Sequence, residues 1–338
     1  MKMKTITYLI LLTIFVHSLG IAQKTKVDTL KYRGPYLGQA TPGATPELFA
    51  PGLISLGYHE HRMAISPDGK EIYYSVFGNE IVVAKIMYTR LENGSWTMPR
   101  VAPFSDKGMN LHPSFTPDGK KFFFTSTRPR NDSSTTNYRA DIWYVERVND
   151  SWTKPTNLGD KVNSIYNDSS PSVMADGTLF FESTRNEEKN LDIYYSVIRN
   201  GEYQVAEKLA SPINTEYQDG SPFIDPDGKY LLFCSNRPES LGQNDLFISF
   251  RTFDGNWSTP RNLGRNINSE YMDWSPCVTP DKKYIIFSSY RNIEPIVPVS
   301  IVLFDSLKTQ LGTPKVGNGT FYWVSAKIID ELKPHELK

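Results

Sequence analysis

Residues 110–128 read NLHPSFTPDGKKFFFTSTR, and residues 141–159, which follow a polar loop, read DIWYVERVNDSWTKPTNLG. The first part has a Pro-Asp-Gly turn followed by a continuous apolar run. The second part has another apolar run, an Asn-Asp pair, and a tryptophan followed three residues later by a proline. This unit recurs along the chain, which indicates a repeat protein.

The Pro-Asp-Gly turn is the most regular feature of the repeat. Proline presets the backbone of such a turn, aspartate caps it, and glycine accepts the left-handed conformation that closes a short hairpin. Successive turn aspartates lie 50, 58, 51 and 54 residues apart. They are Asp68, Asp118, Asp176, Asp227 and Asp281. This period fits a four-stranded propeller blade with loops of variable length.

Three further strands are predicted in each repeat around the turn. The run after the turn is continuously apolar, as in residues 122–124, and such a strand is covered on both faces when blades stack. A third apolar strand follows, then a residue pair such as Asn93-Gly94 that suits a two-residue hairpin. The fourth strand carries a proline, such as Pro99 or Pro155, which indicates the outer edge of the blade.

The fifth repeat is incomplete, and this decides how the ring closes. Its third strand is predicted at residues 321–324, after an insertion from about 293 to 318, and no fourth strand follows. Leu48, Pro51 and Ile54 have the spacing of a fourth strand, so the N-terminal segment is predicted to complete the last blade. The fold predicted is an all-β, five-bladed propeller over residues 46–333.

A six-bladed ring is the alternative. It would use residues 301–304 as the third strand of the fifth blade and the final segment as a degenerate sixth blade. The chain lacks a sixth Pro-Asp-Gly hairpin, which favours five blades.

The N-terminus predicts export. It has a basic start, an apolar run from Ile6 to Val16, and small residues at Gly20 and Ala22, which is the pattern of a signal peptide over residues 1–22. The run is short for a membrane anchor, so no transmembrane segment is expected after cleavage. Residues 23–45 are predicted as a linker and 334–338 as a C-terminal tail. The expected location is periplasmic or extracellular.

Charge and cysteine content limit the classes of partner. The formal net charge is zero, so no overall field attracts nucleic acid, and no nucleic-acid partner is expected. The two cysteines, Cys234 and Cys277, fall in predicted strands of adjacent repeats. Two buried thiols and a single bridge between the repeats are both compatible with this placement.

The repeated motif resembles a known family. The series Ser-Pro-x-x-x-x-Pro-Asp-Gly-Lys, an apolar strand, Ser-Thr/Asn-Arg and Asp-Ile-Tyr is similar to the WD40-like repeats of TolB-type propellers, over roughly residues 46–333. The first repeat lacks the Ser-x-Arg and Asp elements. The resemblance implies an exported propeller but no particular activity, because a propeller can serve as a binding platform, an envelope component or the support of an enzyme.

Arginine and aspartate recur together and predict a structural clamp within each blade. Arginine closes the second strand and aspartate opens the third, and both are absent from the first repeat. The predicted pairs are Arg128 with Asp141, Arg185 with Asp192, and Arg237 with Asp245. Arg291 has Thr320 where its partner should be, so it is a candidate for ligand binding.

A second series lies seven residues before the turn proline position, in the loop that leads into the innermost strand. It consists of Glu60, Asn110, Asp168, Asp219 and Asp273. Equivalent positions on five blades form a ring around the axial channel, and an acidic ring could attract a cation, a basic peptide or a glycan. The alternative interpretation is that each side chain caps its own loop by accepting backbone N–H bonds.

Histidines break the symmetry of the first two repeats. His59, His61 and His112 lie beside Glu60 and Asn110, and converging imidazoles could bind zinc or another divalent cation. Their spacing matches no known metal motif, so no cofactor is predicted, and His112 is retained as a candidate ligand-binding residue. No Gly-rich phosphate loop, Gly-x-Ser-x-Gly elbow or His-Glu-x-x-His pair is found, so no catalytic residue is assigned.

Three functional hypotheses follow. The first is an exported binding or scaffolding module that takes a protein, peptide or glycan of the cell envelope at the channel. The second is a hydrolase or lyase acting on glycans through acidic and histidine residues at the same mouth. The third is a structural component of an envelope complex, working through its blade sides or residues 327–338. A monomer or a subunit of such a complex is expected.

Overall fold

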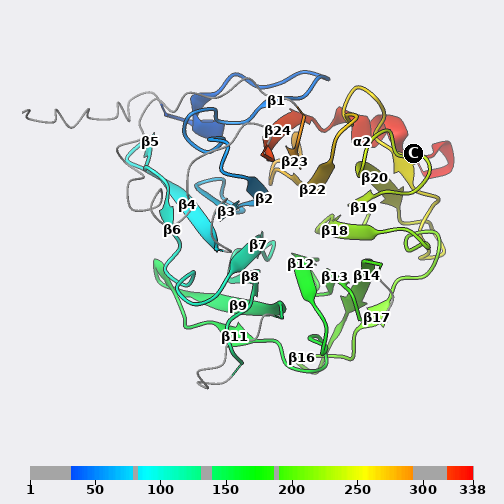
Figure 1. Cartoon of the computed structure of the whole chain (residues 1–338), viewed down its shortest axis with the longest axis horizontal. Coiled ribbons are helices and arrows are strands. Elements are labelled where there is room, and N and C mark those ends of the chain that lie inside the picture. The colour runs from blue at the N-terminus through cyan, green and yellow to red at the C-terminus, as the bar shows by residue number, and fades with distance from the viewer. Residues whose placement is uncertain (1–31, 79–82, 131–138, 186–189, 292–317, 338) are drawn as a thin grey trace, which may run out of the picture.

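The computed structural model describes residues 32–78, 83–130, 139–185, 190–291 and 318–337. Its strands form antiparallel sheets arranged as five blades around an axis, as Figure 1 shows. The five-bladed prediction is therefore confirmed. The insertion and residues 301–304, on which the six-bladed alternative depends, lie outside the described residues.

Each blade begins with an innermost strand beside the axis, and successive strands lie progressively further out (Figure 1). The first blade contains β2 (Glu60–Ile65), β3 (Glu71–Phe77), β4 (Ala84–Glu92), β5 (Ser95–Trp96) and β6 (Arg100–Val101). The second contains β7 (Asn110–Phe115), β8 (Lys121–Ser126), β9 (Asp141–Val148), β10 (Ser151–Trp152) and β11 (Thr156–Asn157). The third contains β12 (Asp168–Val173), β13 (Leu179–Ser183), β14 (Asp192–Ser196) and β17 (Glu207–Lys208), with a side hairpin of β15 (Ile198–Arg199) and β16 (Glu202–Tyr203).

The last two blades follow the same order. The fourth contains β18 (Asp219–Ile224), β19 (Tyr230–Ser235), β20 (Asp245–Phe250) and β21 (Arg261–Asn262). The fifth contains β22 (Asp273–Val278), β23 (Tyr284–Ser289), β24 (Thr320–Ser325) and β1 (Glu47–Leu48). The only α-helix among the described residues, α2 (Lys327–Leu332), and the 3-10 turn η4 (His335–Leu337) follow the last strand.

The N-terminal segment closes the ring as predicted. Strand β1 pairs antiparallel with β24, with Glu47 opposite Trp323 and Leu48 opposite Tyr322. Phe49 follows directly, is fully buried, and packs edge-on against Trp323 with 5.2 Å between ring centroids. The chain's two ends are thereby joined in one sheet, which covers the edge that β24 would otherwise expose.

Part of the segment predicted as a linker packs against the propeller. The short helix η2 (Pro35–Gly38) buries Leu37, and Trp96 of β5 donates its indole N–H to the carbonyl of Gly34 at 2.8 Å. Residues 33–38 therefore extend the closure from the fifth blade to the first.

Apolar clusters between neighbouring blades form the core. One joins Tyr73 and Ile86 of the first blade to Phe122 and Trp143 of the second. The cysteines lie in another pair of neighbours: Cys234 on β19 and Cys277 on β22 are both buried and both free. Burial raises the pKa of each thiol to about 12, so these thiols stay protonated. The interpretation as two buried thiols thus fits the structure.

Every innermost strand carries a bulge at the same place. The register between the first and second strands shifts there in all five blades, for example between His61 and Met63 of β2. The bulged residues have φ between 48° and 53° and are Arg62, His112, Ser170, Ser221 and Ser275. A bulge redirects one side chain, so this position is where a blade can place a chosen group near the axis.

The closure gives a prediction. Substitution of Phe49 by alanine should lower the free energy of unfolding by about 3–5 kcal/mol, because it leaves a cavity beside Trp323. Phe253→Ala is the matched control, since Phe253 is 89% exposed and its loss should change stability by less than about 0.5 kcal/mol. Urea denaturation of the three proteins measures both values. Equal stability of the two variants would show that the N-terminal segment does not hold the ring.

Candidate functional site: the axial channel

The acidic series lies at the face where loops lead into the innermost strands, which we call the loop face. Asp168, Asp219 and Asp273 are each 0% exposed. In Asp219, Oδ2 accepts the backbone N–H of Thr215 at 2.7 Å and its hydroxyl at 2.6 Å. Asp168 and Asp273 cap their loops through a serine in the same way. The loop-capping interpretation accounts for these carboxylates, which offer no exposed oxygen to a ligand.

The arginines that close the second strands bind this series and not the aspartates of the third strands. Arg185, Arg237 and Arg291 donate through Nη2 to Asp168, Asp219 and Asp273 at 2.5, 2.6 and 2.7 Å. The side chain at the second strand's end lies directly opposite the start of the innermost strand, because Ser235 pairs with Asp219 in the ladder. Arg291, predicted to be available for a ligand, is therefore bound within its own blade.

The second blade keeps this clamp with a neutral partner. Arg128 donates to Oδ1 of Asn110 at 2.8 Å and lies 3.4 Å from Asp106, which is 57% exposed. In the first blade Gly78 stands at the arginine's position, because Val76 pairs with Glu60 as Ser126 pairs with Asn110. There Glu60 accepts the backbone N–H groups of Leu56 and Tyr58 at 2.9 and 3.1 Å. Burial raises the pKa of Glu60.

The aspartates of the third strands hold the outer strands, so the predicted Arg–Asp pairs are corrected. Asp141 and Asp245 accept from Asn157 and Asn262 at 3.0 and 2.6 Å. Asp192 is paired with Lys208 at 2.6 Å. In the second, third and fourth blades the arginine and the aspartate thus make two separate ties, one for the inner pair of strands and one for the outer pair.

These clamps give a second prediction. Arg237→Met should lower the free energy of unfolding by about 3–5 kcal/mol, because it leaves the buried Asp219 carboxylate without its cation. Arg265→Met alters an exposed arginine of the same blade region and should change stability by less than about 0.5 kcal/mol. Thermal or urea unfolding tests this, and a loss below 1 kcal/mol for Arg237→Met would contradict a structural role for the pair.

The histidines gather at the loop-face end of the channel in an aromatic cluster. His61 stacks on Trp274 with 3.9 Å between ring centroids, and His112 meets His61 edge-on at 4.7 Å. His61 Nε2 lies 2.6 Å from the hydroxyl of Ser275, and His59 Nε2 lies 2.5 Å from that of Tyr290. Within the described part of the chain, no three His, Cys, Asp or Glu side chains are grouped so as to hold a metal ion. The imidazoles contact aromatic rings and hydroxyls.

Burial makes these histidines resist protonation. It lowers the pKa of His59 and of His112 to about 4, and that of His61 well below its usual range, helped there by the neighbouring His112. Around His112, Glu182 favours the protonated form while Arg62 opposes it. The cluster is therefore neutral at physiological pH.

A third prediction follows from the protonation of His112. Between pH 6.5 and about 4 the unfolded chain binds a proton there that the native state does not, so stability falls as the pH falls. His112→Gln should make the slope of unfolding free energy against pH shallower by up to about 1.4 kcal/mol per pH unit in this window. His335→Gln, in the exposed C-terminal turn, is the control and should keep the wild-type slope. Identical slopes for all three proteins would contradict the prediction.

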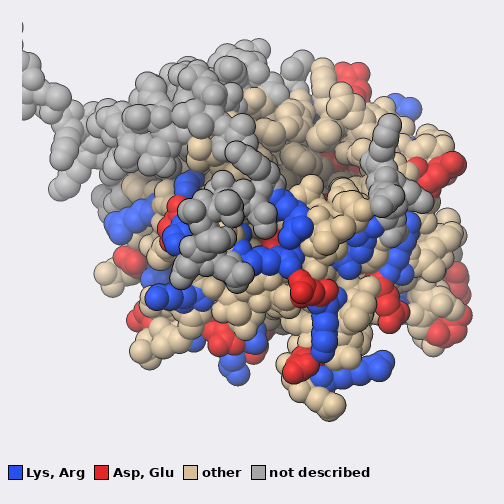
Figure 2. Space-filling model, turned by 60° about the horizontal axis from the view of Figure 1, so that its bottom comes forward, with Lys and Arg blue, Asp and Glu red and all other residues tan. Residues whose placement is uncertain are grey.

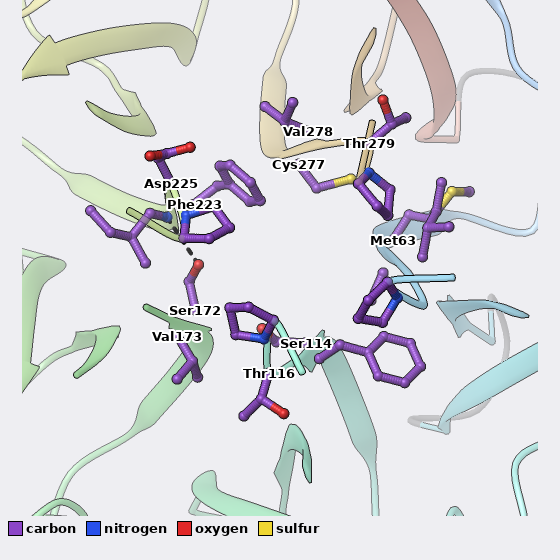
Figure 3. Close-up of a pocket in the computed structure, with 18 of the residues that line it drawn as sticks. Met63, Ser114, Thr116, Ser172, Val173, Phe223, Asp225, Cys277, Val278 and Thr279 are labelled. Atoms are coloured by element: carbon purple, nitrogen blue, oxygen red, sulfur yellow. Dashed lines mark hydrogen bonds between the residues drawn. The ribbon is translucent and has the colours of Figure 1, made fainter. Parts of the chain in front are cut away.

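The opposite end of the channel opens into a cavity at the turn face, where the Pro-Asp-Gly turns lie. It has a volume of 480 Å³ and is lined by residues from all five blades. Figure 3 shows Met63, Val173, Phe223, Cys277 and Val278 around it, so its walls are mainly apolar. Turn prolines 67, 117, 226 and 280 also line it.

Lys282 breaks the symmetry at the rim of this cavity. It takes the place of the turn glycine with φ 59°, and its Nζ lies 3.0 Å from Oδ1 of the fully buried Asp225 and 3.2 Å from Asp227. The ion pairs link the fifth blade to the fourth across the channel mouth.

Arg62 marks the inner end of the cavity and was missed in the sequence analysis. It is the bulged residue of β2, is 2% exposed, and lines the cavity. Its guanidinium donates across the channel to the carbonyls of Pro171 and Pro222 at 3.1 and 2.8 Å. A signal was available: five residues before the turn proline position the repeats have Arg62, His112, Ser170, Ser221 and Ser275, among which only Arg62 has a full charge.

The histidine cluster and Arg62 occupy the inner part of the axial channel, and an apolar cavity lies at its turn-face end. The protein is a five-bladed β-propeller. No family model and no curated protein matches the chain. Solved structures that match include the putative TolB from Agrobacterium tumefaciens, at 19% identity and TM-score 0.46, over 68% of this chain and 70% of that one. TolB from Acinetobacter baumannii matches at 21% identity and TM-score 0.47, over 68% of this chain and 48% of that one.

A third solved structure is an alpha-L-arabinofuranosidase from Lactobacillus brevis, at 12% identity and TM-score 0.49, over 81% of this chain and 91% of that one. Separately, none of the helices in the described ranges is long and apolar enough to span a bilayer.

Proposed function

We propose that this chain is an exported binding or scaffolding module of the cell envelope, and that a protein or peptide partner binds at the turn-face mouth of its channel. The observation that carries the proposal is the 480 Å³ cavity, which combines apolar walls with a few polar groups. Concave, mainly apolar sites of this size are typical of ligand binding.

The rigidity of the mouth supports this assignment. Its rim consists of short turns whose prolines restrict the backbone, and Lys282 with Asp225 ties two of the turns together. A preformed site loses little conformational entropy when a partner binds.

The distribution of charge also favours local recognition. On the side of the molecule drawn in Figure 2, Lys and Arg side chains lie interspersed with Asp and Glu. Together with a net charge of zero, this pattern gives no long-range field of one sign to attract a polyanion. Affinity would then come from contacts within the mouth.

Export is supported by residues 1–22, whose basic start, apolar run and small residues suit a signal peptide. These residues lie outside the part of the chain that the structure describes. The loop-face carboxylates are buried in their own loops and present no oxygen to a partner. The turn face is therefore the better candidate for the binding surface.

A crosslinking experiment tests the proposal. A photoreactive amino acid at Thr116, which lines the cavity, should give an adduct with one envelope partner when the full chain is expressed in its own cell type. The same group at Ile165, 74% exposed in a loop of the opposite face, is the control and should give none. Fractionation of the same cells should place the adduct outside the cytoplasm. Adducts only from Ile165, or only in the cytoplasm, would refute the proposal.

A further inference from the structure

Arg62 departs from its counterparts in every other blade. The equivalent bulged positions hold three serines and His112, and all five backbones have the same left-handed conformation. Because the backbone is shared, the difference lies in the side chain alone. A long cationic side chain at one of five equivalent positions is a departure from symmetry that the shared bulge does not explain.

The hydrogen bonds of Arg62 leave part of its donor capacity unused. Both Nη2 hydrogens are directed to Pro171 and Pro222, and Nη1 makes a long contact of 3.4 Å to the carbonyl of Ser221. A guanidinium has five N–H groups. No acceptor for Nε–H or for the second Nη1 hydrogen is found among the residues that the structure describes.

The charge of Arg62 also lacks a direct ion pair. No carboxylate of the described residues lies within 4 Å of its guanidinium. Glu182 attracts it through space, but that carboxylate accepts hydrogen bonds from Ser169, Ser170 and the backbone N–H of Ser221. A buried cation bonded only to neutral carbonyls is costly, because the charge has lost its hydration and has no anion in contact to offset that loss.

The cavity provides the place for such an anion. Arg62 lies at its inner end, and the walls between Arg62 and the rim include Ile65, Phe115, Phe223 and Val278. Figure 3 shows Phe223 and Val278 beside the open space. A molecule that fills the cavity would therefore bury an apolar body along the walls and bring its inner end to the guanidinium.

We propose that the channel cavity binds the carboxylate end of an apolar molecule and that Arg62 recognises the carboxylate. Arginine suits this role because it stays charged and its N–H groups match carboxylate oxygens. Two kinds of molecule have a carboxylate at the end of an apolar body: a peptide whose C-terminal residues are apolar, and a fatty acid. The inference rests on the proposed function only in taking the turn-face mouth as the binding surface.

Binding assays on the purified mature protein test the inference. The first probe is a fluorescein-labelled peptide, Gly-Ser-Gly-Ala-Leu-Phe, prepared with a free C-terminal carboxylate and as the C-terminal amide. The second is decanoate against decanol. Wild type should bind at least one acid about tenfold more tightly than its uncharged counterpart, because a hydrogen bond to a charged group is lost. A preference for the free-acid peptide over its amide would identify a peptide C-terminus as the ligand. A preference for decanoate over decanol would identify a fatty acid.

Two variants make the result specific. Arg62→Gln should reduce the ratio of acid to uncharged affinity to about one, because an amide keeps donors but has no charge. Ser114→Trp should abolish binding by filling the cavity while Arg62 stays in place, and Ser151→Trp, at an exposed outer strand, should bind as wild type does. Thermal unfolding confirms that each variant is folded.

Two results would overturn the inference: equal affinity of wild type for acid and uncharged probes, including no binding of either, or an acid preference that persists in Arg62→Gln. In both cases an adduct at Thr116 would leave the proposed binding function standing. Arg62 would then serve only to close the channel by bonding carbonyls across it. Failure of the crosslinking together with a clear acid preference would instead indicate a small-molecule site without a protein partner.

Discussion

The pairing of an arginine with the buried carboxylate at the start of the innermost strand is the constraint on which three of the five blades depend. In three blades an arginine is bonded to an aspartate that is 0% exposed, and the same aspartate caps the loop leading into the strand. The guanidinium also lies over rings of the second and third strands, as Arg237 does over Phe233 and Phe247 at 5.2 and 5.0 Å. One side chain thus fixes the loop, the inner ladder and the blade's aromatic layer together.

Because this constraint is repeated, function has to be sought where the repeats differ. The first blade lacks the arginine clamp and has Glu60 bonded to three backbone N–H groups in its place. It is also the blade that the N-terminal segment joins to the fifth, through η2 and Trp96. Without the common clamp, the first blade supplies His59, His61 and Arg62, three of the groups that make the channel asymmetric.

The fold was predictable from the sequence because turn chemistry and strand periodicity act locally. The Pro-Asp-Gly spacing gave the number of blades, and the incomplete fifth repeat indicated the closure by β1. The Arg–Asp pairing was not predictable in the same way. Arg237 and Asp245 lie at the two ends of one loop, but ladder register places Arg237 beside the start of β18, and register is a tertiary property.

The candidate site was only partly predictable, since sequence position does not reveal burial. The acidic series looked like an exposed ring, yet its members are enclosed by their own loops. Comparison of the repeats shows that Arg62 is the one fully charged residue at its position. That its side chain crosses the channel follows only from the bulge, which the sequence does not reveal.

The charged groups of the cavity are paired differently at its rim and at its inner end. Lys282 has a left-handed backbone where the other four turns all have glycine, and its ammonium binds the buried Asp225. At the rim Lys282 is paired with both Asp225 and Asp227, and Asp227 also lies 3.5 Å from Lys229, so two lysines face two aspartates. Arg62, by contrast, contacts only neutral carbonyls. If Arg62 binds a carboxylate as proposed, a ligand that reaches only the rim meets charges that are already paired, whereas one that extends to the inner end meets a cation without a counter-ion. An apolar body long enough to reach Arg62 is then a requirement of the proposed site.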